Sequence, residues 1–227
     1  LSCTEKDETF PEPEIEPGFA ALTVELPTIS EPGTYAIGQA DENTIKEIDV
    51  LVFKRVQGDD IFSYRLKLSE NDIQDASGST YGERKTFDVE LRNDQLIFVI
   101  IANARASVDR IADELKDNVR KEDILAKLVF SQSGKWPATS AGFTPFPMWG
   151  ETRQPVRLTD TSIGPVSLMR AVVRIDIGID VFGDPGLGFG QKFKLKEIYV
   201  YNVMNKGAVT PDMGDPGITG DEPIVTY

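Results

Sequence analysis

The side chains that most often carry out acid–base or nucleophilic chemistry are scarce in this chain of 227 residues. It contains no histidine, the commonest general base and zinc ligand, so no serine–histidine or cysteine–histidine pair can form. Residues 186–190, Gly-Leu-Gly-Phe-Gly, look like part of a phosphate-binding loop. Such a loop needs a helix after it, whereas residues 193–203 have the pattern of a strand. We interpret the run as a turn and predict that the chain is not an enzyme.

Acidic side chains are plentiful, with 37 Asp and Glu against 24 Lys and Arg and a formal net charge of −13. Pairs such as Asp41 with Glu42, or Asp59 with Asp60, could bind calcium or act as paired catalytic carboxylates. None stands at the spacing of a calcium loop, so we interpret nearly all acidic residues as solvated surface and predict no metal and no cofactor. The negative charge repels phosphate backbones, which argues against a nucleic-acid partner.

Aromatic side chains gather in and just after a glycine- and proline-rich stretch, residues 134–147. They are Trp136, Phe143, Phe146 and Trp149. Two interpretations stay open. The two tryptophans could form a platform on which a sugar stacks, or the aromatics could pack over one end of the fold.

The one cysteine, Cys3, follows Leu1 and Ser2 and cannot form an internal disulfide. Leu-Ser-Cys resembles the end of a bacterial lipoprotein signal, in which the cysteine is acylated after cleavage, for example with palmitate. The alternative is an ordinary chain terminus that contains a cysteine. Residues 1–18 are rich in Glu, Asp and Pro, which favours an extended tether. We predict lipidation at Cys3 and a surface-exposed location on the outer membrane. The sequence contains no stretch of about 18 apolar residues that could itself span a membrane.

Most of the remaining chain alternates as strands do. Leu22, Val24 and Leu26 share one face of a first strand, residues 20–26, and residues 86–91 repeat this alternation. Residues 48–53 and 96–101 are apolar on both faces and predict central strands. Two further strands are predicted. Residues 61–68 would bury Phe62, Tyr64, Leu66 and Leu68, and residues 166–179 would bury a face that includes Met169.

One segment has helical spacing, with Ser107 as the expected N-cap and apolar residues from Val108 to Val119, and a shorter helix is expected within residues 122–129. The whole pattern predicts an all-β fold, an antiparallel Greek-key β-sandwich (transthyretin- or immunoglobulin-like) with one inserted helical segment. We expect the sandwich domain to span residues 19–210. Residues 211–227 would be a linker or the start of a further domain.

The order of several motifs resembles the N-terminal domain of the fimbrillin family, the type V pilins. The motifs are Cys3, Ile-Asp-Val-Leu-Val-Phe at 48–53, Leu-Ile-Phe-Val-Ile-Ile-Ala-Asn-Ala at 96–104, Phe-Pro-Met-Trp-Gly-Glu at 146–151, Val-Ser-Leu-Met-Arg-Ala-Val-Val-Arg-Ile at 166–175 and Ile-Tyr-Val-Tyr-Asn-Val at 198–203. Each motif is loose, but their order covers nearly the whole chain.

The resemblance implies a subunit of a bacterial surface fimbria that mediates adhesion and assembles by donor-strand exchange. A protease would remove the first strand, with Leu22, Val24 and Leu26, and a strand of another subunit would take its place. The family's cut follows an arginine in the next loop. Residues 27–47 hold no arginine, and Lys46 is their one basic residue, hence the candidate cleavage site. Partners would be other fimbrial subunits, the outer membrane and the processing protease. The alternative is a surface lipoprotein that binds glycans or host proteins through its loop aromatics.

Overall fold

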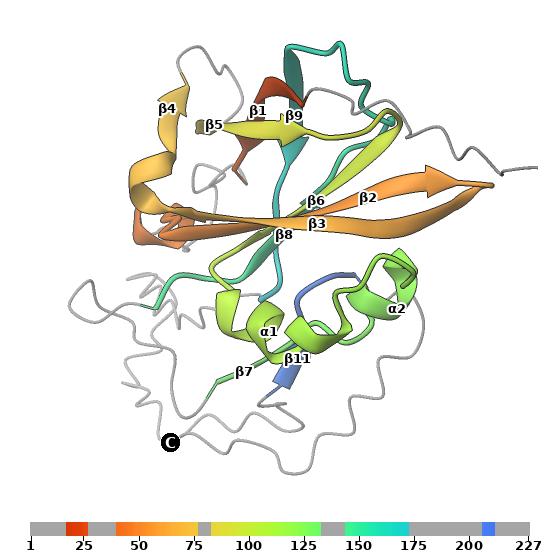
Figure 1. Cartoon of the computed structure of the whole chain (residues 1–227). Coiled ribbons are helices and arrows are strands. Elements are labelled where there is room, and N and C mark those ends of the chain that lie inside the picture. Colours follow the sequence, from red (N-terminus) through yellow and green to blue (C-terminus); the bar gives the residue numbers. More distant parts are fainter. Residues whose placement is uncertain (1–16, 27–39, 77–82, 133–143, 173–205, 212–227) are drawn as a thin grey trace, which may run out of the picture.

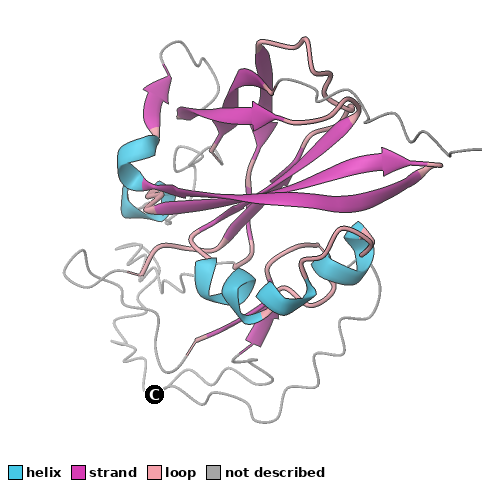
Figure 2. Cartoon of the chain, viewed as in Figure 1, coloured by secondary structure: helices cyan, strands magenta, loops and turns pink. Residues whose placement is uncertain are grey.

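The computed structural model of the chain describes residues 17–26, 40–76, 83–132, 144–172 and 206–211. Two β-sheets stack face to face, and two short helices with a small third sheet cover the far side of one of them (Figure 1, Figure 2). The predicted all-β sandwich with a helical insertion is therefore confirmed.

The four-stranded sheet has the strand order β4-β5-β1-β9. Its members are β1 (Gly18–Glu25), β4 (Gln74–Ala76), β5 (Arg84–Leu91) and β9 (Ser162–Ser167). Strand β5 runs antiparallel to both β4 and β1, whereas β1 and β9 run parallel. This parallel pair departs from the predicted antiparallel arrangement. Because β1 and β9 are far apart in sequence, no tight hairpin forces them to run in opposite directions.

The five-stranded sheet is antiparallel, with the order β10-β8-β6-β2-β3. Its members are β2 (Glu47–Val56), β3 (Asp59–Ser69), β6 (Leu96–Ala102), β8 (Met148–Glu151) and β10 (Met169–Arg170). Every residue of β6 is buried, and β2 is buried from Ile48 to Phe53. The two continuous apolar runs are therefore central strands covered on both faces, as predicted.

The five-stranded sheet forms the middle layer of the molecule, because each of its faces contributes to a separate apolar core (Figure 1). The core between the sheets includes Leu22, Val24, Val50, Phe98 and Ile100. The core under the helices includes Leu51, Phe53, Val99, Val108 and Ile124. Neighbouring residues along β2 and β6 thus serve different cores, as the alternation of a β-strand requires.

The prediction that Phe62 and Tyr64 share one face is wrong. Strand β3 contains a bulge, since Val52 pairs with Tyr64 while the next residue, Phe53, pairs with Phe62. The extra residue, Ser63, reverses the side-chain alternation. Phe62 therefore packs under the helices, where its ring lies edge-on to that of Phe53 with the ring centres 5.9 Å apart, and Tyr64 packs between the sheets.

The helical segment is shorter than predicted. Helix α1 spans Arg105–Arg110. Helix α2 spans Lys121–Leu125 and thus begins one residue before the second predicted segment, residues 122–129. Ser107 is buried inside α1 and is not its N-cap. The Arg105 N–H instead donates to Glu47 Oε1 at 3.1 Å, so a residue of β2 satisfies the helix N-terminus. The sequence around Ser107 could not reveal this distant partner.

Short elements complete the described fold. They are the 3₁₀ turns η1 (Ala40–Asn43), η2 (Glu70–Asp72) and η3 (Ala112–Glu114), and a two-stranded sheet of β7 (Val129–Ser131) and β11 (Lys206–Ala208). In the described residues, no helix has the length and apolar character needed to cross a membrane.

The predicted strand at residues 166–179 is also corrected. Val166 and Leu168 are buried between the sheets, but Met169 is 51% exposed. After Leu168 the chain leaves β1 and pairs Met169 with Trp149 of β8, which belongs to the other sheet. The change of sheet removes Met169 from the buried face. Residues 173–179, the strand predicted at 193–203 and the glycine run at 186–190 lie outside the described residues.

Candidate functional site

The first strand, β1, lies inside its sheet with β5 on one side and β9 on the other (Figure 1). Its inward side chains close the core between the sheets. Leu22 and Val24 are 0% exposed and Leu26 is 2% exposed. The predicted burial of these three residues is therefore confirmed, while their displacement stays a prediction. An N-terminal strand in this position leaves a gap between two other strands if it departs.

The pairing of β1 with β5 is regular from Gly18, opposite Leu91, to Glu25, opposite Arg84. Two side-chain contacts reinforce this ladder. The Thr86 hydroxyl donates to Leu22 O at 3.2 Å, and Arg84 Nη2 lies 3.1 Å from Glu25 Oε1. The β5 side of β1 is therefore the more continuous of its two hydrogen-bonded edges.

The pairing of β1 with β9 is interrupted at Thr23. Leu22 pairs with Ile163 and Val24 with Val166, so Thr23 alone faces both Gly164 and Pro165 in a β-bulge. Gly164 has a φ of +102°, and a Cβ there would lie 2.4 Å from Thr23 O. Glycine is thus required for its conformation and for the close approach of β1. Proline also lacks an N–H to donate to β1.

Of the two residues predicted to be processed, Cys3 and Lys46, only Lys46 belongs to the described structure. Cys3 lies outside the described residues. Lys46 immediately precedes β2 with an exposed side chain, and its backbone N–H donates to Asn103 Oδ1 at 2.9 Å. Its neighbour Ile45 is 6% exposed and Ile48 is 0% exposed. A protease that cuts after Lys46 would have to pull these neighbours out of the core.

The two tryptophans proposed for sugar stacking are not described as one platform. Trp136 lies outside the described residues. Trp149 is a strand residue of β8 and not a loop residue, and it is half-buried against the core under the helices. Its indole N–H is buried and has no hydrogen-bond partner among the described residues. Phe146 is buried, so packing is its role in the described structure.

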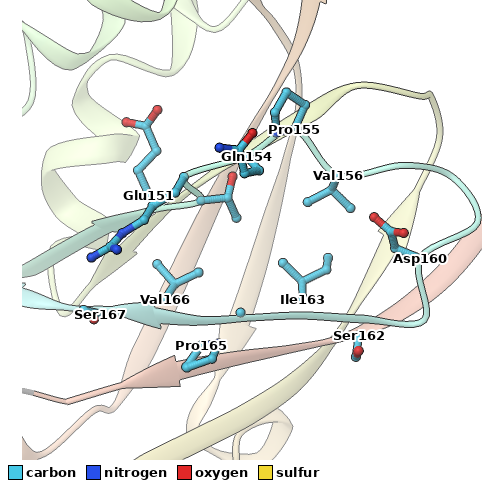
Figure 3. A pocket seen from close by; sticks show the side chains of 13 residues that line it. Glu151, Gln154, Pro155, Val156, Asp160, Ser162, Ile163, Pro165, Val166 and Ser167 are labelled. Carbon is cyan, nitrogen blue, oxygen red and sulfur yellow. The ribbon is translucent and has the colours of Figure 1, made fainter.

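A cavity of about 280 Å³ opens at the edge of the sandwich beside β9 (Figure 3). Ile163 and Val166 project into it from β9, and Val156 projects from the facing wall. Arg153 and Ser162 are exposed at its border. The described residues contain no group of three or more Cys, Asp or Glu that could hold a metal ion. The cavity is thus an opening between the two sheets with an apolar floor.

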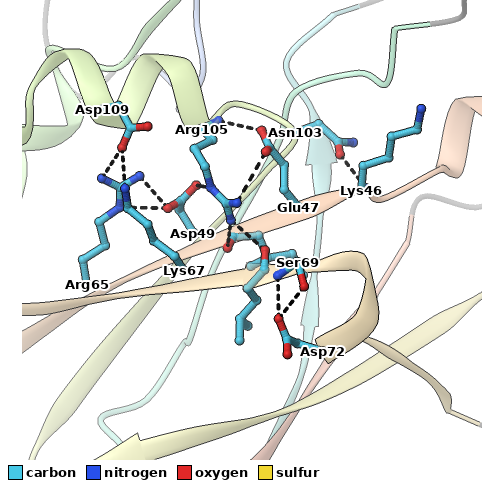
Figure 4. A network of polar contacts seen from close by, with 12 residues as sticks. Lys46, Glu47, Asp49, Arg65, Lys67, Ser69, Asp72, Asn103, Arg105 and Asp109 are labelled. Carbon is cyan, nitrogen blue, oxygen red and sulfur yellow. Dashed lines mark hydrogen bonds and ion pairs between the residues drawn. The ribbon is translucent and has the colours of Figure 1, made fainter.

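Asp49 carries a charge into the middle layer, where it is 0% exposed (Figure 4). It pairs with Arg65 Nη2 at 2.6 Å and with Arg105 Nε at 3.1 Å. Arg65 also contacts Asp109 of α1 at 2.7 Å. These pairs attach α1 to β2 and β3. The residues belong to different elements, and sequence spacing gave no signal of the cluster.

Asp60 is an exception to the expectation that nearly all acidic residues are solvated surface, because it is 8% exposed. Burial alone would raise its pKa, but hydrogen bonds from Lys121 and Arg55 and their charges hold the pKa below its ordinary value. Burial also opposes the charge of Lys121, yet Asp60 and Glu151 raise the pKa of its ammonium group. Lys121 lies 2.8 Å from Asp60 and 2.5 Å from Glu151. The cluster fastens α2 to the sheet.

Glu42, another residue of the acidic pairs, is 6% exposed and lies 3.5 Å from Arg170. It is therefore also a buried, paired carboxylate.

Comparisons with known proteins come from solved structures, since no family model and no curated protein matches the chain. The chain is similar to a fimbrial assembly protein from Parabacteroides distasonis, with 16% identity and a TM-score of 0.42 over 69% of this chain and 54% of that one. It is also similar to the tip fimbrial protein Mfa3 from Porphyromonas gingivalis with a C-terminal truncation, with 15% identity and a TM-score of 0.43 over 68% of this chain and 48% of that one.

The names of these two structural neighbours describe fimbrial proteins. The chain spans about half of their length. Identities and TM-scores of this size do not assign the chain to a family. Its function is therefore inferred from the geometry of β1 and from the sequence motifs.

Proposed function

We propose that this chain is a structural or anchoring subunit of a bacterial surface fimbria. In this proposal it is exported as a lipoprotein, carries its lipid on Cys3 and lies at the outer membrane. Its first strand is exchanged for a strand of another subunit, and the assembled fimbria mediates adhesion. The role is non-catalytic.

The observation that carries the proposal is the interior position of β1, bonded to β5 and β9 and buried along one face. Loss of this strand would leave two unpaired strand edges and an apolar groove between them. A groove of this kind accepts an extended segment, because backbone hydrogen bonds supply affinity and alternate side chains supply specificity. The sequence motifs in fimbrillin order supply the second, independent support.

The burial of β1 gives the size of the driving force. Leu22, Val24 and Leu26 are almost completely removed from water. At about 1.5–3 kcal/mol for each such side chain, the empty groove would lose about 5–9 kcal/mol of apolar burial. A domain of this size has about 5–15 kcal/mol of total stability, so loss of β1 would remove a large part of it. Removal of β1 would therefore be coupled to capture of another strand.

The test uses the full-length lipidated protein and a trypsin-like protease. Proteolysis after Lys46 should release the segment that ends at this residue and produce a ladder of polymers that resists SDS. A Lys46→Gln variant is the control for the site of the cut and should keep β1 attached and stay monomeric. Clean loss of the N-terminal segment with no polymer would count against strand exchange.

A further inference from the structure

Gly18 occupies the first inward position of β1, opposite Leu91. A Cβ at this position would lie 2.9 Å from Leu158 O and 3.6 Å from Leu158 Cδ1. The first of these distances is too short for a carbon–oxygen contact. Because Gly18 has no positive φ, the backbone conformation does not call for glycine. The requirement at this position is space.

The backbone that crowds Gly18 is held in place from two directions. The Leu158 N–H donates to Asp94 Oδ1 at 3.1 Å. Two residues earlier, Val156 and Leu96 exchange backbone hydrogen bonds of 2.7 and 2.8 Å, which join the segment to β6. These contacts hold the backbone that carries Leu158 O close to Gly18. Leu158 O is therefore a steric block at the end of the β1 position.

The steric block at Leu158 O distinguishes registers of β1 that strand pairing alone would allow. A slip of β1 by one residue along β5 would turn Thr23 and Glu25 inward, and the apolar core excludes these polar side chains. A slip by two residues would keep the same face inward. It would, however, place either Ala20 or Glu16 beside Leu158 O, and both carry a Cβ. Among the inward residues of the described segment 17–26, only Gly18 has no Cβ.

We propose that Leu158 O fixes the register of the strand that fills the β1 position and selects a strand with glycine at its first inward position. This inference rests on the proposed strand exchange. The strand that fits has the pattern glycine, small, large, branched, large at alternate positions, as in Gly18, Ala20, Leu22, Val24 and Leu26. The incoming strand would run antiparallel to β5 and parallel to β9, as β1 does.

The first experiment uses the full chain with a site-specific protease sequence inserted within residues 27–39. After the cut, labelled peptides with the sequence of residues 17–26 compete for the β1 position. The Gly18→Val peptide should bind about tenfold more weakly than the native peptide or worse, because it is overpacked against Leu158. The matched Phe19→Val peptide should bind like the native one, since Phe19 is 69% exposed. Equal binding of the two variant peptides would overturn the proposal.

If no peptide enters the groove, including the native one, that result contradicts strand exchange. A second experiment then tests separately whether Leu158 O fixes the register of β1. It uses the uncut chain with Cys3→Ser and the pair Thr23→Cys and Thr86→Cys, which are direct cross-strand partners. Added Gly18→Val should reduce the oxidised fraction of this pair several-fold in a glutathione buffer. Added Phe19→Val should leave it unchanged. Equal oxidation in both variants would overturn the steric block.

Discussion

The β-bulge on β9 makes a quantitative prediction about how firmly β1 is held. Gly164→Ala places a Cβ 2.4 Å from Thr23 O in a backbone with a φ of +102°. Gly58→Ala, at the tip of the β2–β3 hairpin, is the matched control because its φ is +99° and a Cβ there meets nothing within 4 Å. The two variants share the conformational strain, and only Gly164→Ala pushes against β1.

The two effects can be separated by size. A non-glycine residue held at positive φ costs about 1–3 kcal/mol, which is the expected loss for Gly58→Ala. Overpacking adds about 1–3 kcal/mol, so Gly164→Ala should lose about 2–6 kcal/mol in all. The excess over the control measures the crowding at Gly164, against Thr23 O of β1 at 2.4 Å and Val166 N of β9 at 2.9 Å.

Two measurements check this prediction. Urea unfolding gives the difference in the free energy of unfolding between the two variants. Amide hydrogen exchange then locates it, and protection should fall in β1 more than in β2 or β6 for Gly164→Ala only. Equal losses in both variants, or unchanged protection in β1 of Gly164→Ala, would refute the idea that the bulge governs how β1 is held.

Three further predictions concern buried polar groups. Asp49→Ala removes the buried carboxylate that pairs with both Arg65 and Arg105, which keep only their partly exposed partners Asp109 and Glu47. It should cost about 3 kcal/mol in urea unfolding, against at most about 1 kcal/mol for Asp75→Ala, whose carboxylate is exposed; similar losses would contradict this. The lowered pKa of Asp60 stabilises the fold above the ordinary value of 3.8, and this contribution disappears as the pH falls through the folded-state pKa. The Tm advantage of the native chain over Asp60→Asn should therefore shrink below pH 3.8, and a constant difference would contradict it. Burial raises the pKa of Tyr64 to about 12, so ultraviolet titration should show a late-titrating phenol that is lost in Tyr64→Phe.

Much of the sandwich could be predicted because burial repeats every second residue. The alternation around Leu22 and Val24 identified an inward face, and the unbroken run from Leu96 to Ile101 identified a strand covered twice. Both inferences need only neighbouring residues. Contacts between sheets impose this pattern on the sequence wherever a strand is regular.

The predictions of buried faces fail where a strand does not keep the two-residue alternation of its side chains. The bulge at Ser63 turned Phe62 to the other core, and the change of sheet after Leu168 exposed Met169. The predicted exposure of charged residues was wrong for a different reason. Asp49 and Asp60 are stabilised by partners from distant elements, and a single sequence does not show which cation will lie beside which carboxylate.

The candidate site combines these two kinds of information, and this determines what can be inferred about its specificity. The inward face of β1 follows from its own residues, but its neighbours β5 and β9 come from distant parts of the chain. The alternating apolar face would fit many strands in more than one register. Leu158 O and the Gly164 bulge do not repeat along the groove, so they are the features that can distinguish one register from the next. A chain that exchanges its first strand needs such features, because apolar alternation alone rejects only slips by an odd number of residues.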